Sequence, residues 1–246
     1  MHDDPDAIPD AGDEPDDEAT DRMFQPDVVG PAVEFLAELA AGGRALELGV
    51  GTGRIAIPLA ARGVEVHGID LSQDAIERLR AKPGGDAIGV TLGDFATVRV
   101  DGVFRLAYLV YNTINNLTTQ AAQVACFQNV AEHLGSGGHF VIEVVVPDLR
   151  RLPYGERFVI FDASESHWGV DEYDVATQGL ISHHFDIRGT DVHKSSGEFR
   201  YVWPSELDLM ARLAGLELRE RWAGWQREPF TSDSRQHVSI WVKPSP

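Results

Sequence analysis

A glycine-rich turn near residue 50 constrains the fold of this chain more than any other stretch. An apolar run, residues 45–48, leads into Gly49, Gly51 and Gly53, and a helical pattern follows at residues 55–61. Glycine gives the backbone conformations that are closed to other residues, and it lets a ligand approach without an intervening Cβ. The order of strand, glycine turn and helix therefore predicts a loop that holds a nucleotide-type cofactor.

The composition predicts a single soluble domain. With 246 residues, of which 43% are hydrophobic, the chain can bury one substantial core. No apolar run is long enough to cross a bilayer, and the N-terminus lacks the basic and apolar pattern of a secretory signal. The single cysteine, Cys126, excludes an internal disulfide. We therefore expect a cytoplasmic protein without a membrane partner.

Acidic residues are concentrated at the N-terminus. The net charge is −18, yet residues 1–21 carry ten acidic groups and no lysine or arginine, which leaves 29 acidic against 21 basic residues in the rest of the chain. Residues 1–23 are rich in Asp and Pro and have almost nothing to bury, so we expect a disordered tail. The folded domain then spans residues 24–246. Because no basic stripe follows, nucleic acid is not expected as the main partner.

Alternating strands and helices predict an α/β fold. Strands are expected at residues 45–48, 64–69, 87–92, 104–111 and 140–146, and helices at 27–40, 55–61, 72–80 and 120–134. Five strands that alternate with helices favour a parallel, doubly wound sheet. A helix at 206–214 and strands at 216–225 and 236–242 complete a seven-stranded sheet.

The pattern changes after Pro147. Apolar and polar residues alternate with period two at 158–161, 180–187 and 198–202, and turn residues rather than a helix separate these runs. Such alternation predicts antiparallel strands. We interpret residues 147–203 as an antiparallel β insertion after the fifth strand, placed over the carboxyl end of the sheet as a substrate cover.

Four motifs occur in an order that resembles the class I S-adenosylmethionine-dependent methyltransferases. They are residues 47–53 (Glu-Leu-Gly-Val-Gly-Thr-Gly), Asp70 at the end of the second strand, residues 93–95 (Gly-Asp-Phe) after the third, and residues 133–138 (His-Leu-Gly-Ser-Gly-Gly) before the fifth. The resemblance covers residues 24–246. It implies a Rossmann-like fold with S-adenosylmethionine as the cofactor.

The resemblance also implies roles for the acidic residues. Glu47 is similar to the acid that orients the ammonium group of the cofactor, and the glycine loop passes under its methionine part. Asp70, followed by Leu71, resembles the acid that accepts both ribose hydroxyls, a task that suits the two oxygens of a carboxylate. Asp94 resembles the residue that takes the adenine amino group.

Two further stretches complete the implied cofactor site. The resemblance implies that the backbone of Phe95 and neighbouring apolar groups flank the adenine ring, and that the backbone at 110–112 contacts the methionine end. The cofactor-binding residues implied for this chain are Glu47, Gly49, Gly51, Gly53, Asp70, Leu71, Asp94, Phe95, Val110 and Tyr111.

Two other functions stay open. A protein that binds the cofactor without turnover, for example a regulatory protein, is one alternative, because no catalytic base is evident. A nicotinamide-dependent oxidoreductase is a remote one. A dinucleotide loop has its third glycine one position later, where this chain has Arg54, and its helix N-terminus binds a pyrophosphate. The carboxylates of Glu47, Asp70 and Asp94 would repel the phosphates of a dinucleotide. They suit the positively charged sulfonium and ammonium groups of S-adenosylmethionine.

No single residue stands out as the catalyst. In methyl transfer, a nucleophile of the substrate attacks the activated methyl group of the cofactor. The protein has mainly to align these two reactants and to exclude water. An amine nucleophile needs only to be neutral, whereas a hydroxyl usually needs a base. On an alternating strand His183 and His184 face opposite sides, so at most one of them points into a pocket. The catalytic candidates are His167, His183, His184, Tyr201 and Asn112.

Absent motifs narrow the substrate. Residues 111–114 at the end of the fourth strand are Tyr-Asn-Thr-Ile. They do not match the Asn/Asp-Pro-Pro-Tyr motif of enzymes that methylate the exocyclic amines of nucleic-acid bases or the side chain of protein glutamine. No His/Cys group has zinc spacing, so no metal is expected. The size, the insertion and residues 230–239 (Phe-Thr-Ser-Asp-Ser-Arg-Gln-His-Val-Ser) are similar to those of small-molecule enzymes, including the amino-sugar N-methyltransferases. We therefore expect N- or O-methylation of a small molecule, with a homodimer as one arrangement.

Overall fold

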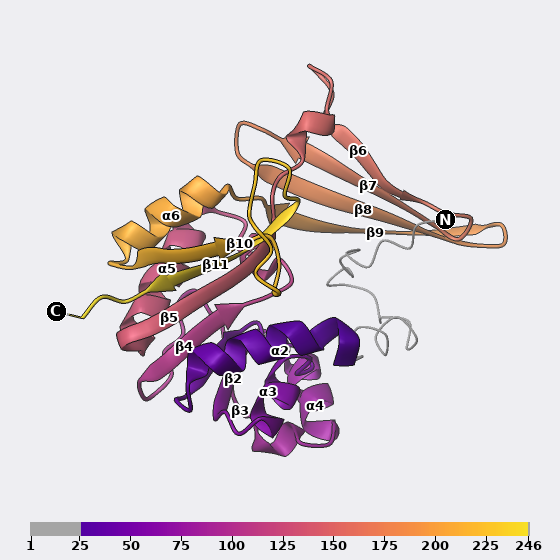
Figure 1. Ribbon diagram of the computed structural model, residues 1–246. Coiled ribbons are helices and arrows are strands. Elements are labelled where there is room, and N and C mark those ends of the chain that lie inside the picture. Colours follow the sequence, from indigo (N-terminus) through magenta and orange to yellow (C-terminus); the bar gives the residue numbers. More distant parts are fainter. Residues whose placement is uncertain (1–25, 246) are drawn as a thin grey trace.

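The computed structural model describes residues 26–245, which contain two β-sheets (Figure 1). The expected acidic tail, residues 1–23, lies outside the described residues. In the described part, the main sheet has seven strands in the order β10-β11-β5-β4-β1-β2-β3. These strands are β1 (Ala45–Leu48), β2 (Val66–Asp70), β3 (Gly89–Leu92), β4 (Phe104–Leu109), β5 (Leu134–Val145), β10 (Glu217–Trp222) and β11 (Gln236–Val242).

The main sheet confirms the predicted doubly wound α/β fold. Strands β3, β2, β1, β4 and β5 run parallel, and β11 and then β10 add antiparallel pairs at one edge. Every residue of β1 is buried, as an apolar run between helices on both faces requires. Helices α2 (Pro26–Ala40), α3 (Ala56–Ala61) and α4 (Gln73–Ala81) cover one face, and α5 (Gln120–His133) and α6 (Pro204–Leu213) cover the other (Figure 1).

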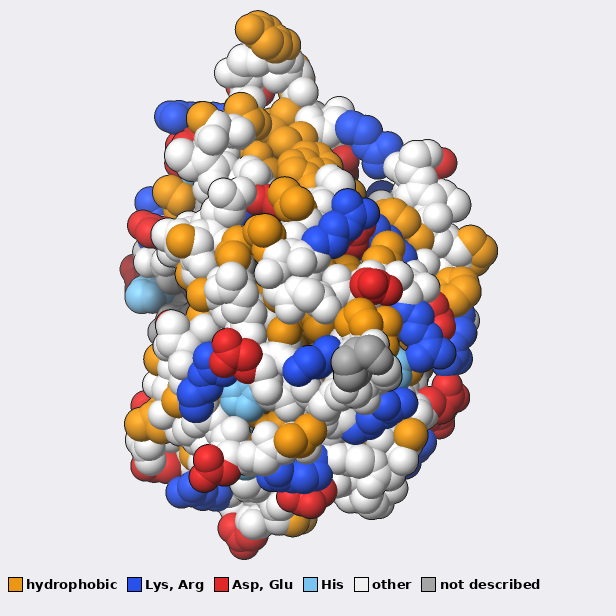
Figure 2. Space-filling model, turned by 90° about the vertical axis from the view of Figure 1, so that its left-hand side faces the viewer, with side chains coloured by type: hydrophobic (Ala, Val, Ile, Leu, Met, Phe, Trp, Pro, Cys, Tyr) orange, Lys and Arg blue, Asp and Glu red, His pale blue; other side chains and the backbone are white. Residues whose placement is uncertain are grey.

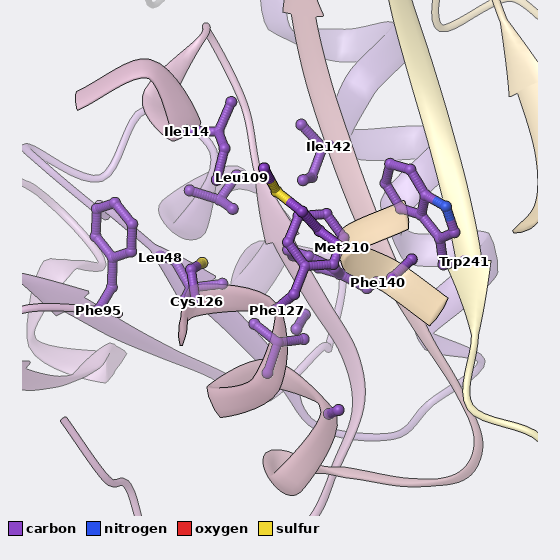
Figure 3. Packing of buried hydrophobic residues seen from close by; sticks show 14 of the residues in the cluster. Leu48, Phe95, Leu109, Ile114, Cys126, Phe127, Phe140, Ile142, Met210 and Trp241 are labelled. Carbon is purple, nitrogen blue, oxygen red and sulfur yellow. The ribbon is translucent and has the colours of Figure 1, made fainter. Parts of the chain in front are cut away.

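Aromatic packing fixes α5 and α6 on the sheet (Figure 3). The Phe127 ring of α5 meets the rings of Phe140 and Trp241 edge-on, with centroid distances of 5.0 and 5.5 Å. Met210 of α6 belongs to the same buried cluster. Burial of one such side chain contributes roughly 1.5–3 kcal/mol. The cluster therefore packs α5 and α6 against the paired strands β5 and β11.

Several element boundaries differ from those predicted. Helix α3 begins at Ala56 rather than at residue 55, so Pro58 lies in the first turn, where its missing N–H is not needed. Ser72 caps α4, because its hydroxyl accepts the Ala75 N–H at 3.1 Å. Strand β5 begins at Leu134, six residues earlier than expected, because residues 134–139 already pair with their neighbours. Strand β10 ends at Trp222.

The antiparallel insertion is confirmed, but it has four strands rather than the three expected runs. The strands are β6 (Phe158–Ala163), β7 (His167–Asp174), β8 (Gly179–Arg188) and β9 (Asp191–Arg200). Polar residues at most positions of β7 and of the first half of β9 hid the alternating pattern. Tyr201 was expected inside a strand but follows β9. A short 3₁₀ helix, η3 (Leu149–Arg151), precedes β6.

A buried arginine attaches the second sheet to the main domain. The Arg200 side chain, at the end of β9, donates to Glu206 of α6 at 2.7 Å and to Gln178 at 3.1 Å. It also donates to Gln123 of α5, whose amide group contacts the backbone of Ile114. Arg200 is only 4% exposed. The end of β9 therefore lies against η2 (Thr113–Asn116), the 3₁₀ turn that follows β4.

The surface in Figure 2 carries charges of both signs. Acidic and basic side chains alternate over its lower part, and hydrophobic side chains gather near the top, where the second sheet lies. No helix within residues 26–245 is both long and apolar enough to span a bilayer.

Candidate cofactor-binding site

The glycine turn lies between β1 and α3, at the carboxyl end of the main sheet. Gly49, Gly51 and Gly53 all have positive φ, at 75°, 52° and 83°. A Cβ at Gly49 would lie 2.6 Å from a methyl carbon of Thr113, whereas one at Gly51 would meet no described atom within 4 Å. Gly49 therefore allows close packing between two loops, and Gly51 presents bare backbone to an open side of the turn.

The Asp70 carboxylate folds back onto this turn. One of its oxygens accepts the Gly51 N–H at 2.6 Å, and the other accepts the Ser72 N–H at 2.8 Å. Each oxygen keeps a further lone pair for a ligand hydroxyl. The neighbouring Leu71 side chain is 69% exposed, so it can pack on a flat ligand beside the carboxylate.

Asp94 and Phe95 form the next wall of the site. One oxygen of Asp94 accepts the Ala96 N–H at 2.8 Å. The Phe95 side chain is buried in the core, and its carbonyl accepts the Asn129 side-chain amide at 2.9 Å. The buried side chain of Phe95 thus fixes the loop that follows β3. The Asp94 carboxylate lies at the surface of this loop.

Glu47 is a buried acid at the end of β1. Its carboxylate accepts the Tyr108 hydroxyl at 2.9 Å, and the residue is 2% exposed. Burial raises the pKa of Glu47 to about 8, although the Tyr108 hydrogen bond and the Arg54 charge act to lower it. Glu47 is therefore largely protonated at neutral pH, and a cationic group placed beside it would draw out the proton.

Arg54 is a site residue that the sequence did not single out. Its guanidinium carbon lies 3.4 Å from the centre of the Tyr111 ring. Burial lowers the pKa of Arg54, while Tyr111, Glu47 and Glu143 act to raise it. The sequence offered only its position after the third glycine as a signal. Arg54 places a positive charge between two acids that come from different strands.

The turn after β4 is held in an unusual conformation. Tyr111 and Asn112 have φ values of +52° and +61°, which cost about 1–3 kcal/mol each in a residue with a Cβ. The Tyr111 N–H donates to the Glu143 carboxylate at 3.1 Å, and the Asn112 side-chain oxygen accepts the Val145 N–H at 2.7 Å. Asn112, a catalytic candidate, therefore uses its amide oxygen to attach this turn to β5.

Comparison with known proteins decides the family. The methyltransferase domain family matches residues 45–138. The solved structure of the CcbJ methyltransferase from Streptomyces caelestis is similar to this chain with 37% identity and a TM-score of 0.81, over 90% of this chain and 91% of that one. The chain is a class I S-adenosylmethionine-dependent methyltransferase.

Two further relatives extend the comparison. The cypemycin N-terminal methyltransferase of a Streptomyces species is 26% identical over 81% of this chain and 82% of its own length. CalS10 from Micromonospora echinaspora, an amino pentose methyltransferase, is 19% identical, with a TM-score of 0.67 over 92% of this chain and 95% of that one. At this identity the CalS10 likeness shows the shared fold.

The methyltransferase carries its histidine candidates in the second sheet rather than at the glycine turn. His167 lies 2.7 Å from Asp162 and 3.0 Å from His184. His183 instead contacts Ser196 at 2.8 Å, so the two adjacent histidines face opposite sides of β8, as predicted. Within residues 26–245, no group of three or more His, Cys, Asp or Glu side chains is arranged to hold a metal ion.

Tyr201 is buried at the base of the second sheet. Its ring is 5.6 Å from that of Tyr173 and 6.3 Å from that of Trp203, and the residue is 2% exposed. Burial raises the pKa of the Tyr201 hydroxyl above its usual value. These contacts describe a packing role for the ring at the junction with the main domain.

Glu143 and Trp225 are two more residues that the sequence did not indicate. The Trp225 indole N–H donates to the Glu143 carboxylate at 2.6 Å, and its ring meets Phe35 of α2 edge-on at 5.5 Å. Residues 223–235 between β10 and β11, here called the closing segment, are thereby attached to both β5 and α2. Neither residue belongs to a local motif, because each gains its role from a partner distant in the chain.

Proposed function

We propose that this methyltransferase transfers a methyl group from S-adenosylmethionine to an amine of a small molecule. The observation that carries the proposal is the set of acids around the glycine turn: buried Glu47, Asp70 bonded to the turn itself, and Asp94. Such a set suits a ligand with cationic groups and hydroxyls, and it disfavours the pyrophosphate of a nicotinamide cofactor. We infer that the protein acts in the cytoplasm, where a thiol such as Cys126 stays reduced.

The residues fit the cofactor as follows. Asp70 would accept the ribose hydroxyls through lone pairs that its contacts with Gly51 and Ser72 leave available. Glu47 would face the ammonium group, and Asp94 the adenine amino group. The bare backbone of Gly51 fits close approach of a ligand, because no described atom lies within 4 Å of a Cβ built there. When bound, S-adenosylmethionine supplies an activated methyl group that the lone pair of the acceptor displaces from sulfur.

An amine acceptor is supported by the turn after β4. Among the described residues, the acceptors that hold this turn are the Glu143 carboxylate, the Asn112 side-chain oxygen and backbone carbonyls, rather than a histidine. A neutral amine carries its own nucleophilic lone pair, whereas a hydroxyl would need a base at this place. The relatives support the same choice, since one is named for the N-terminus of cypemycin and another for an amino pentose.

We assign the second sheet the role of a substrate cover. Its strand β9 ends against η2, which directly follows the turn at Tyr111 and Asn112. Arg200 fixes that end to α5 and α6, so the sheet has a rigid base beside the carboxyl ends of β4 and β5. A cover of this kind would exclude water from the acceptor, which favours transfer over side reactions.

The function is tested in two steps. Calorimetry with S-adenosylmethionine, S-adenosylhomocysteine and NAD measures cofactor choice; binding of NAD alone would overturn the proposal. Label transfer from methyl-labelled donor is then measured on amino sugars, on peptides with free N-termini and on matched hydroxyl analogues. Transfer to amines is the expected result. Transfer to the hydroxyl analogues alone would overturn the amine assignment, and binding without any transfer would support a regulatory protein instead.

A further inference from the structure

Two buried polar atoms at the carboxyl end of the main sheet have no hydrogen-bond partner among the described residues. They are Nε2 of His237, which is fully buried, and Oδ1 of Asn115, which is 4% exposed. His237 is the second residue of β11 and pairs with Val144 near the end of β5. Asn115 belongs to η2, just after the β4 turn. Proteins rarely leave such atoms unpaired, because each costs about 1–3 kcal/mol of stability.

A chain of hydrogen bonds orients the His237 ring. Arg221, paired with Asp208 at 2.7 Å, donates from Nε to the Ser239 hydroxyl at 2.7 Å. The same hydroxyl oxygen lies 2.8 Å from Nδ1 of His237. Because Arg221 can only donate, the Ser239 hydroxyl is free to turn its own hydrogen toward Nδ1. In the tautomer that this arrangement allows, Nδ1 accepts the Ser239 hydroxyl hydrogen and the ring hydrogen lies on Nε2.

The His237 ring is neutral at physiological pH. Burial lowers the pKa of His237 to about 3, with the Arg221 charge acting in the same direction and Asp208 against it. A group with this pKa does not keep a proton taken from a substrate at pH 7, so His237 does not suit general base catalysis. It suits the role of a neutral N–H donor to an oxygen atom.

We propose that His237 Nε2 donates a hydrogen bond to an oxygen of the acceptor molecule and so positions the acceptor amine for methylation. The inference rests on the proposed function and narrows its substrate class to amines with a hydroxyl or carbonyl oxygen near the nitrogen. At the same end of the sheet, Oδ1 of Asn115 can accept a hydrogen bond, whereas Nε2 of His237 donates one.

The closing segment controls access to this histidine. The Phe230 ring, which belongs to this segment, packs edge-on against His237 with a centroid distance of 5.7 Å. Since His237 itself is fully buried, an acceptor reaches Nε2 only when its cover shifts. A segment between two strands, only part of which is buried, moves more readily than the strands that hold the ring.

The test compares His237→Leu with His139→Leu as a matched control. His139 is also buried, is contacted by an arginine (Arg219, 2.7 Å) and has one ring nitrogen without a partner among the described residues. It lies, however, at the opposite end of the β5–β11 pairing, beside Val242. With an amine that the wild type methylates, His237→Leu should raise KM for the amine about 10-fold or more. The S-adenosylhomocysteine affinity should stay unchanged, and His139→Leu should alter neither quantity.

An analogue of that amine without the neighbouring oxygen separates contact from distortion. It should show the same KM with wild type and His237→Leu, because the hydrogen bond is missing in both cases. If His237→Leu does not fold, Ser239→Ala, which releases Nδ1, should raise KM several-fold instead. Unchanged KM values in these variants overturn the inference while the proposed function stands. A wild type that methylates no amine overturns the proposed function and the inference with it.

Discussion

The Tyr108 hydroxyl donates a 2.9 Å hydrogen bond to the Glu47 carboxylate, and the two residues are direct neighbours on the parallel strands β4 and β1. Both side chains are buried. Burial raises the pKa values of both groups, that of Glu47 to about 8. In the candidate cofactor site, Glu47 thus holds a proton that a cationic ligand can displace.

Cofactor binding should release a proton. At pH 7 most Glu47 side chains are protonated, and the ammonium group of the cofactor favours the ionised form, which lowers the pKa of Glu47 in the complex. Calorimetry at pH 7 in buffers of different ionisation enthalpy should show the release of up to about one proton per site. Glu47→Gln should abolish the buffer dependence and weaken binding. A wild-type enthalpy that is the same in all buffers would contradict this prediction.

Stability of the free protein should fall as the pH rises from about 4.5 to 8. The pKa of Glu47 in the folded state, about 8, lies above its ordinary value of 4.5, so the folded protein binds this proton more tightly than the unfolded chain does. Between these two values only the unfolded chain ionises at Glu47, so the free energy of unfolding falls by up to about 1.4 kcal/mol per pH unit. Denaturant unfolding at pH 6 and pH 8.5 measures the loss. Glu47→Gln, which cannot ionise, should lose less stability over the same range.

Asp70→Ala should weaken S-adenosylhomocysteine binding by about 1–3 kcal/mol, because ribose hydroxyls would lose their acceptor. The turn itself should also loosen, since Asp70 accepts the N–H groups of Gly51 and Ser72. Asp74→Ala is the control: Asp74 lies in the first turn of α4 and is exposed. Calorimetry should give unchanged affinity for Asp74→Ala, and an equal affinity for Asp70→Ala would refute the ribose assignment.

Local sequence indicates the candidate cofactor residues far better than the residues on the proposed acceptor side. The glycine turn, Asp70 and Asp94 each lie at or just after the end of a parallel strand, so strand order alone places them at one edge. Glu143 and Trp225 gain their roles from a contact between residues 82 positions apart, which no local pattern encodes. His237 lies in the stretch 230–239 that the sequence did indicate, but the register of β11 on β5 decides at which end of the sheet it lies, and no local pattern gives that register. The extra strand β7 was missed because its polar residues conceal the period-two pattern.

Trp225→Phe should loosen the closing segment without unfolding the domain. The change keeps an aromatic ring against Phe35 but removes the N–H that donates to Glu143, a hydrogen bond to a charged group that contributes about 1.5–3 kcal/mol. Hydrogen exchange should accelerate in residues 223–235, because this contact attaches the segment to β5. Trp222→Phe is the control, because its N–H bonds Glu220 within the same strand. Equal exchange in the two variants would contradict the attachment through Glu143.

Arg200→Met should destabilise the protein by about 3–5 kcal/mol, because it leaves Glu206 without its main partner in a site where both side chains are largely buried. Burial alone would raise the pKa of Glu206, yet hydrogen bonds from Arg200, Gln178 and Gln120 bring it below its ordinary value. The stability from this pair is therefore present above pH 4.5 and is lost as the pH falls through the lowered pKa, so the cost of Arg200→Met should shrink in acid.

The exposed pair of Arg157 with Glu172 is the control for Arg200. The Arg157 side chain is 65% exposed, so Arg157→Met should cost less than about 1 kcal/mol at any pH. Denaturant unfolding at pH 7 and pH 4 measures both variants. If Arg200→Met costs no more than Arg157→Met at pH 7, the second sheet is not anchored through Arg200, and its role as a cover would need another support.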